Sequence, residues 1–185
     1  MRTRLFALGA TVALLSLAGC SDEQADTGPV LPPVQVVQLP AASAGGACIL
    51  WDYEFIEEMI GVTFEVAAAG QVDDTSTCVV QTTKGDWPYL SFSVVESTKA
   101  DADLFVDERM PAKATKLKGL GEAGYRQVSK AKGDRGPIVE IAWLSEAAQL
   151  QTLRYTFEKS AKSADVKKME SKLLDLAKGM DTTNG

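Results

Sequence analysis

The chain has 185 residues and no histidine, and its 19 basic and 25 acidic side chains give a formal net charge of -6. The lack of histidine removes the usual general base near neutral pH and the commonest zinc ligand, and the acidic balance opposes binding to nucleic acid. We therefore expect no enzymatic activity, no cofactor, no metal ion and no nucleic-acid partner.

The first residues are typical of a bacterial lipoprotein signal. Arg2 and Arg4 precede the uncharged span from Leu5 to Leu17, and Leu17-Ala18-Gly19-Cys20 has the layout of a lipoprotein cleavage box. The span is shorter than the roughly 20 apolar residues that a transmembrane helix needs. Residues 1–19 are therefore predicted to be a signal peptide. By resemblance to such signals, Cys20 becomes the first mature residue, carries a diacylglycerol thioether, and anchors the chain on the outer face of the cytoplasmic membrane.

A proline-rich tether is predicted for residues 20–46. Four of the seven prolines are Pro29, Pro32, Pro33 and Pro40, which favours a semi-extended spacer. The alternation of apolar residues in 34–39 leaves a second possibility open, because such a pattern also favours an edge strand of the following domain.

Two cysteines remain once Cys20 is assigned to lipid. An even remainder in an exported protein indicates a disulfide, here between Cys48 and Cys78. Two separately buried thiols, or one reactive cysteine, are the alternatives. A reactive thiol would have no histidine to activate it.

The first half of the folded part reads as a helix followed by a hairpin. Asp52 is a favourable N-cap for a helix over residues 53–60, which Gly61 ends. Residues 70–74 are expected to form a loop. Period-two alternation over residues 76–96, with a turn at 84–86, predicts an antiparallel hairpin.

The second half begins with another helix and ends with a third. A helix is expected over residues 99–110, stopped by Pro111, and a basic connector over 113–118. Strands at 125–129, 138–144 and 150–158 then form a meander. An amphipathic helix over 164–178 ends at Gly179, and residues 181–185 form a frayed tail.

These elements predict one α+β domain over residues 47–180. Its antiparallel sheet has about five strands in two hairpin-based units and is packed with three helices.

The lipoprotein box, the cysteine pair between the first helix and the first strand, and Gly119-Leu120-Gly121-Glu122-Ala123 together resemble actinobacterial envelope lipoproteins of unknown function, of the mycobacterial and streptomycete type. The resemblance spans most of residues 47–180. It implies a cell-surface lipoprotein with a sheet-and-helix fold, and it implies no catalytic residues.

The expected function is that of a non-enzymatic binding or accessory module with an envelope protein as partner. Its surface is predicted to be a groove or sheet face carrying aromatic residues, namely Trp87, Tyr89, Trp143 and Tyr155. The alternative is a carrier of a lipid or other apolar ligand, in which the helices would not close fully over the sheet. A hydrolase with paired carboxylates is less favoured, because the acids cluster on predicted helix faces and loops.

Overall fold

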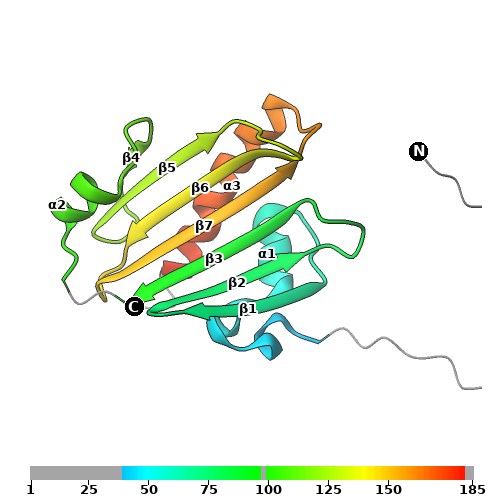
Figure 1. The fold of residues 1–185 in the computed structure, drawn as a ribbon, viewed down its shortest axis with the longest axis horizontal. Helices are drawn as coiled ribbons and strands as arrows, with labels where there is room; N and C mark the ends of the chain where they lie inside the picture. The colour runs from blue at the N-terminus through cyan, green and yellow to red at the C-terminus, as the bar shows by residue number, and fades with distance from the viewer. Residues whose placement is uncertain (1–38, 97–98, 182–185) are drawn as a thin grey trace, which may run out of the picture. The chain divides into compact units, whose positions relative to one another are not determined.

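A seven-stranded antiparallel sheet forms the centre of the molecule (Figure 1). The computed structural model describes residues 39–96 and 99–181. The strands are β1 (Val66–Val72), β2 (Thr75–Gln81), β3 (Tyr89–Glu96), β4 (Thr115–Leu117), β5 (Ala123–Ser129), β6 (Arg135–Leu144) and β7 (Gln149–Glu158). Their order across the sheet is β1-β2-β3-β7-β6-β5-β4, so both predicted hairpin units join in one sheet through the pairing of β3 with β7. The α+β class is confirmed, whereas the expected number of about five strands is too low.

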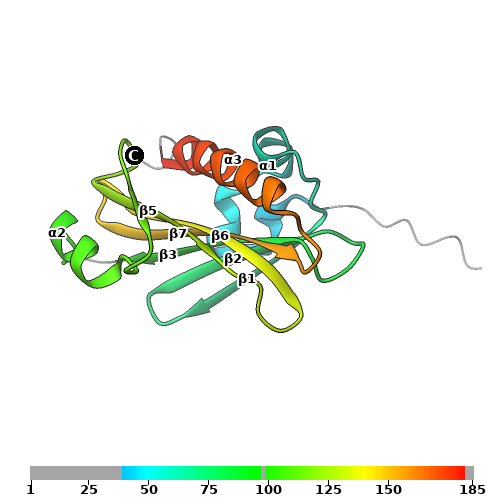
Figure 2. The same cartoon turned by 90° about the horizontal axis from the view of Figure 1, so that it is seen from above.

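Helices cover mainly one face of this sheet (Figure 2). The helical segments are the 3-10 turns η1 (Ala41–Ala44) and η2 (Gly46–Leu50), the α-helices α1 (Tyr53–Ile60), α2 (Ala102–Leu104) and α3 (Ser163–Asp181), and the π-helical turn η3 (Phe105–Arg109). The start of α1 is the predicted one, because the Asp52 carboxylate accepts a hydrogen bond from the Glu54 N–H at 2.8 Å. Gly61 ends the helix in the left-handed region, with φ of 72°.

The prediction of a loop over residues 70–74 is wrong. Gly70 to Val72 belong to β1, and only Asp73 and Asp74 form the turn to β2, with Asp73 at a φ of 48°. The segment Ala67-Ala68-Ala69-Gly70 has little intrinsic preference for a strand. Its extended form comes from pairing with β2, which periodicity within the segment does not reveal.

Two predictions between the hairpins also need correction. The helix expected over 99–110 is shorter, because the Asp101 carboxylate caps the Leu104 N–H at 2.8 Å and so starts α2 at Ala102. Within the expected connector 113–118 lies β4, which pairs with β5. A strand of three residues is too short to show an alternation of its own.

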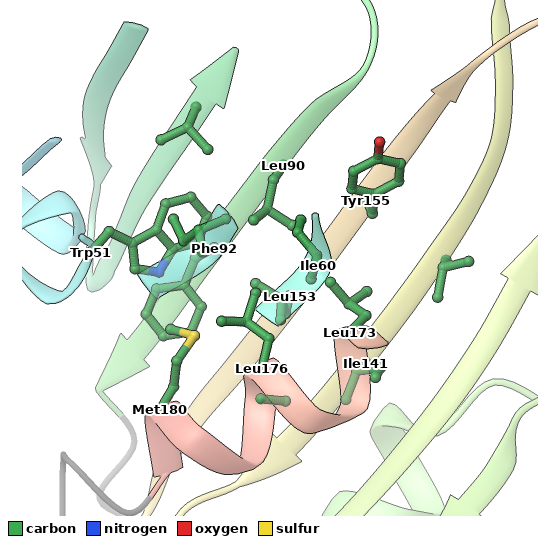
Figure 3. Close-up of a cluster of buried hydrophobic side chains, with 14 of the residues drawn as sticks. Trp51, Ile60, Leu90, Phe92, Ile141, Leu153, Tyr155, Leu173, Leu176 and Met180 are labelled. Atoms are coloured by element: carbon green, nitrogen blue, oxygen red, sulfur yellow. The ribbon is translucent and has the colours of Figure 1, made fainter. Parts of the chain in front are cut away.

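The core lies between the sheet and the pair α1 and α3. A stacked row of aromatic rings crosses it, with centroid distances of 5.9 Å from Trp51 to Phe92 and 6.1 Å from Phe92 to Trp143. Figure 3 shows Leu173, Leu176 and Met180 of α3 pointing into this cluster. Burying a side chain of this size stabilises the fold by about 1.5–3 kcal/mol.

Gly179 does not end the last helix, contrary to the prediction. The helix continues to Asp181, and a Cβ at Gly179 would lie 2.9 Å from Phe55 Cζ of α1. The missing side chain therefore allows α1 and α3 to approach closely. A sequence pattern does not distinguish a glycine that ends a helix from one that permits a close contact.

The predicted disulfide between Cys48 and Cys78 is present and joins η2 to β2. A second link runs beside it, because the Ala47 N–H donates to Ser76 Oγ at 2.9 Å. Ala41 of η1 is also fully buried, so the folded body includes residues that precede the predicted boundary at 47. The predicted signal peptide, Cys20 and residues 20–38 of the tether lie outside the described residues, as does most of the possible edge strand 34–39.

Candidate binding surface

The second face of the sheet has no helix over a large part of its area. Four core residues lie opposite one another in register on neighbouring strands, namely Cys78, Phe92, Leu153 and Ile141. Their side chains point toward α1 and α3, so the residues next to them along each strand point to the second face. Over β2, β3 and β7, most of these neighbouring residues are small, and all except Arg154 are uncharged. The members are Thr77, Val79, Tyr89, Ser91, Ser93, Val95, Thr152 and Arg154, and we call them the open face.

The remaining part of the second face is covered by α2 and η3. Phe105 of η3 packs on Tyr125, Ala142 and Leu144 in a separate small core. Its ring is stacked on that of Tyr125 with a centroid distance of 5.8 Å. Figure 2 shows that these segments lie at one end of the sheet and leave β1, β2 and β3 free of helices on this side.

A hydrogen-bonded group that includes Arg154 lies at the centre of the second face. Arg154 Nε donates to Glu140 Oε2 at 2.6 Å, and the Tyr125 hydroxyl donates to Glu140 Oε1 at 2.9 Å. Burial, and then the neighbouring Glu140 carboxylate, raise the pKa of Tyr125 above its ordinary value, so the phenol keeps its proton and remains a donor. Because Arg154 and Glu140 neutralise each other, the centre of this face carries little net charge.

Hydroxyl groups provide the remaining polarity. Thr77 Oγ1 and Ser93 Oγ are 3.1 Å apart and hydrogen-bonded to each other. Thr156 of β7 pairs with Tyr89 of β3 in the sheet register and is fully buried. Its Oγ1 has no hydrogen-bond partner among the described residues. The arrangement offers short donors and acceptors along adjacent strands, which suits contacts with polar or backbone groups of a partner.

Two of the four predicted aromatic residues belong to this surface. Tyr89 starts β3 on the open face, and Trp87 stacks on it with a centroid distance of 5.2 Å. Both side chains are half-buried. Such a pair has the size and partial exposure of an interface anchor.

The other two predicted aromatic residues do not lie at a surface, which corrects the prediction. Trp143 is fully buried and Tyr155 is 3% exposed, both on the side of α1 and α3. Burial, and then the Glu158 charge, raise the pKa of Tyr155 to about 12. Alternation placed both residues on an apolar strand face, and the helices cover that face.

A depression near the N-terminal end of the body adjoins η1 and η2. It has a volume of about 600 Å³ and is lined in part by Leu39, Ile49, Leu50 and Trp51. Leu39 and Ile49 are 64% and 66% exposed. The middle of the space between sheet and helices is filled, since Leu153, Leu173 and Leu176 have no exposed surface. At its border, a depression of about 280 Å³ lies between the start of α3 and the β5–β6 hairpin.

Among the residues that the structure describes, no three His, Cys, Asp or Glu side chains gather as potential metal ligands. Within the same residues, no helix has the length and apolar character needed to span a membrane.

Comparison of the chain with protein-family models, with curated proteins and with solved structures gave no match.

Sequence reasoning missed the polar residues of the open face, including Ser91, Ser93 and Arg154. A signal was present in β3, where Ser91 and Ser93 alternate with the apolar Leu90, Phe92 and Val94. This alternation identifies the outward side of a half-buried strand. It does not say that no helix covers that side.

Proposed function

We propose that this protein is a non-enzymatic binding module of the cell envelope, anchored by lipid on Cys20 to the outer face of the cytoplasmic membrane. The observation that carries the binding function is the open face: a large part of the sheet without helices, with small polar residues and the Trp87–Tyr89 pair at its border. The partner is an envelope protein, because short hydroxyl groups and a neutralised ion pair complement the polar backbone and side chains of a protein surface.

The hydroxyl groups of the open face support a binding role over catalysis. Thr77 and Ser93 bond to each other, and no histidine exists to act as a base on Ser91. The only carboxylate at the centre, Glu140, is engaged by Arg154 and Tyr125. A carrier of an apolar ligand is the weaker alternative, because the middle of the interface between the sheet and α1 and α3 is tightly packed. The apolar depressions, at η1 and η2 and between α3 and the β5–β6 hairpin, are open at the surface.

The open face is tested by placing a large side chain on it. Ser91→Tyr is expected to reduce the yield of crosslinked envelope partner in affinity capture by at least about tenfold, since a protruding ring separates two matched surfaces. Ser171→Tyr introduces the same ring at an exposed position of α3 and should leave the yield within about twofold of wild type. Equal yields from the two variants would refute the open face as the contact surface.

The anchor is tested at its only possible attachment atom. Cys20→Ala removes the thiol and should abolish incorporation of a fatty-acid probe, with the protein retained as precursor or released from the membrane. Cys48→Ala leaves the lipoprotein box intact and should keep the label. Label remaining on the Cys20 variant would exclude the proposed anchor.

A further inference from the structure

The two edges of the sheet differ in how they are protected. β4 is three residues long and has Lys116 at its centre, and both features discourage pairing with another strand. β1 at the opposite edge has seven residues, no charge and no proline, and all of them except the half-buried Ala67 are exposed. An edge strand with these properties can accept a further strand.

The hydrogen-bonding phase shows which backbone groups of β1 face outward. The Glu96 N–H donates to the Asp74 C=O, so the even-numbered residues of β2 direct their backbone groups to β3 and the odd-numbered ones direct theirs to β1. The partners of those odd-numbered residues in β1 are Val66, Ala68, Gly70 and Val72. Ala67, Ala69 and Gln71 therefore turn their N–H and C=O groups to the outside.

No hydrogen bond of the described residues occupies this outer side. β1 pairs with β2 alone, and η1 and η2 make no backbone hydrogen bond to it. Its central residues are Ala67, Ala68, Ala69 and Gly70, so larger side chains of an added strand would have room beside them on the second face. On the other face, η1 and η2 contact β1, and a Cβ at Gly46 would lie 3.3 Å from the Ala69 Cβ.

Charges at the two ends of β1 select the occupant. Glu65 precedes the strand, and Asp73 and Asp74 follow it, all exposed. The Glu65 carboxylate accepts hydrogen bonds from the hydroxyl and the N–H of Thr83, which hold its pKa below the ordinary value. The charge of Lys84 lowers the same pKa further.

This distribution disfavours pairing with a second copy. An antiparallel pair of β1 strands centred on Ala69 would set Glu65 of each copy opposite Asp73 of the other, and like charges directly opposite destabilise a strand pair. A strand with basic ends would meet carboxylates at both ends instead.

We propose that the outer edge of β1 binds an extended segment of a partner protein, uncharged along its centre and carrying lysine or arginine at both ends. The inference rests on the proposed binding function but concerns a different surface from the open face. The two can therefore fail separately, because Ser91→Tyr leaves the backbone groups of Ala67, Ala69 and Gln71 free.

The probe is a fluorescein-labelled peptide, Lys-Lys-Val-Thr-Val-Thr-Val-Lys-Lys, and its binding to the full chain is measured by fluorescence anisotropy. Gln71→Pro removes one outward N–H that β2 does not use, and should weaken binding by at least about tenfold. Gln71→Ala keeps that N–H and should bind within about twofold of wild type. Circular dichroism checks that both variants retain the fold.

Two further peptides separate backbone pairing from charge. A peptide with alternate N-methylated amides cannot form the ladder, and a peptide with glutamate in place of the terminal lysines meets like charges. Each should bind at least about tenfold more weakly than the probe. Asp74→Lys should reduce the difference in affinity between the lysine-ended and glutamate-ended peptides.

Amide hydrogen exchange of Ala69 and Gln71 gives a direct readout. Exchange should be fast in the free protein and slow with the probe bound. Absence of probe binding, or equal binding by wild type and Gln71→Pro, would overturn the proposal. So would slow exchange without probe, which would mean that the chain itself occupies the edge, or a dimer that Gln71→Pro dissociates, which would assign the edge to a second copy.

Discussion

Gly121→Ala is expected to lower the free energy of unfolding by about 3 kcal/mol or more. Gly121 has a φ of 53°, and a Cβ there would overlap the Leu144 carbonyl oxygen and lie 2.9 Å from its carbon. The chain passes this close to β6 because the Glu122 N–H donates to the Leu144 C=O at 2.9 Å where β5 begins. The backbone would have to move away from β6, which also carries the buried Trp143. Urea unfolding followed by tryptophan fluorescence measures the loss.

Gly119→Ala is the matched control. Gly119 has a φ of 72°, but no atom lies within 4 Å of the position of an added Cβ. Its substitution should cost only the backbone strain of a left-handed residue, about 1 kcal/mol. A similar decrease in the free energy of unfolding in the two variants would show that the contact with Leu144 does not limit the position of this loop.

Loss of the disulfide is expected to lower the free energy of unfolding by about 2–4 kcal/mol. The bond spans a sequence separation of 30 residues and joins two fully buried sulfur-bearing side chains, Cys48 and Cys78. It restricts the unfolded chain, and in the folded state it holds the short η2 turn against β2. The double variant Cys48→Ala, Cys78→Ala should unfold at a clearly lower urea concentration than the oxidised wild type.

Adding a reductant distinguishes the stabilisation by the disulfide from the stabilisation by side-chain packing around the two cysteines. It should destabilise the wild type and leave the double variant unchanged, because the variant has no bond to reduce. A wild type whose unfolding does not depend on reductant would contradict a stabilising role for the bond.

Helices and strands could be predicted where their own residues carry a local pattern, such as a cap or an alternation of apolar and polar residues. Asp52 and Gly61 define both ends of α1, because a capping carboxylate and a left-handed glycine act on the adjacent backbone. The hairpin of β2 and β3 follows from alternation over residues 76–96, and the meander of β5 to β7 follows in the same way. The pairing of Cys48 with Cys78 followed from counting cysteines in a chain expected to be exported.

The candidate site was less predictable. Alternation placed Trp143 and Tyr155 on one strand face, opposite to the face of Ser91 and Ser93, which were not among the predicted surface residues. Which face α1 and α3 cover depends on contacts between segments far apart in the chain, so two aromatic residues selected as a surface are core.

The sequence by itself determined the α+β class, the ends of α1, the two hairpin units and the disulfide partners, since each depends on neighbouring residues or on a count. Only the tertiary structure decided that β1 and β4 are strands, because each is extended through its pairing with a neighbour. It also decided that β3 pairs with β7, that Gly179 permits the close contact between α1 and α3, and that no helix covers a large part of one sheet face. One long edge strand, β1, pairs on one side only. These features arise from packing between distant segments, for which a local pattern of residues carries no physical signal.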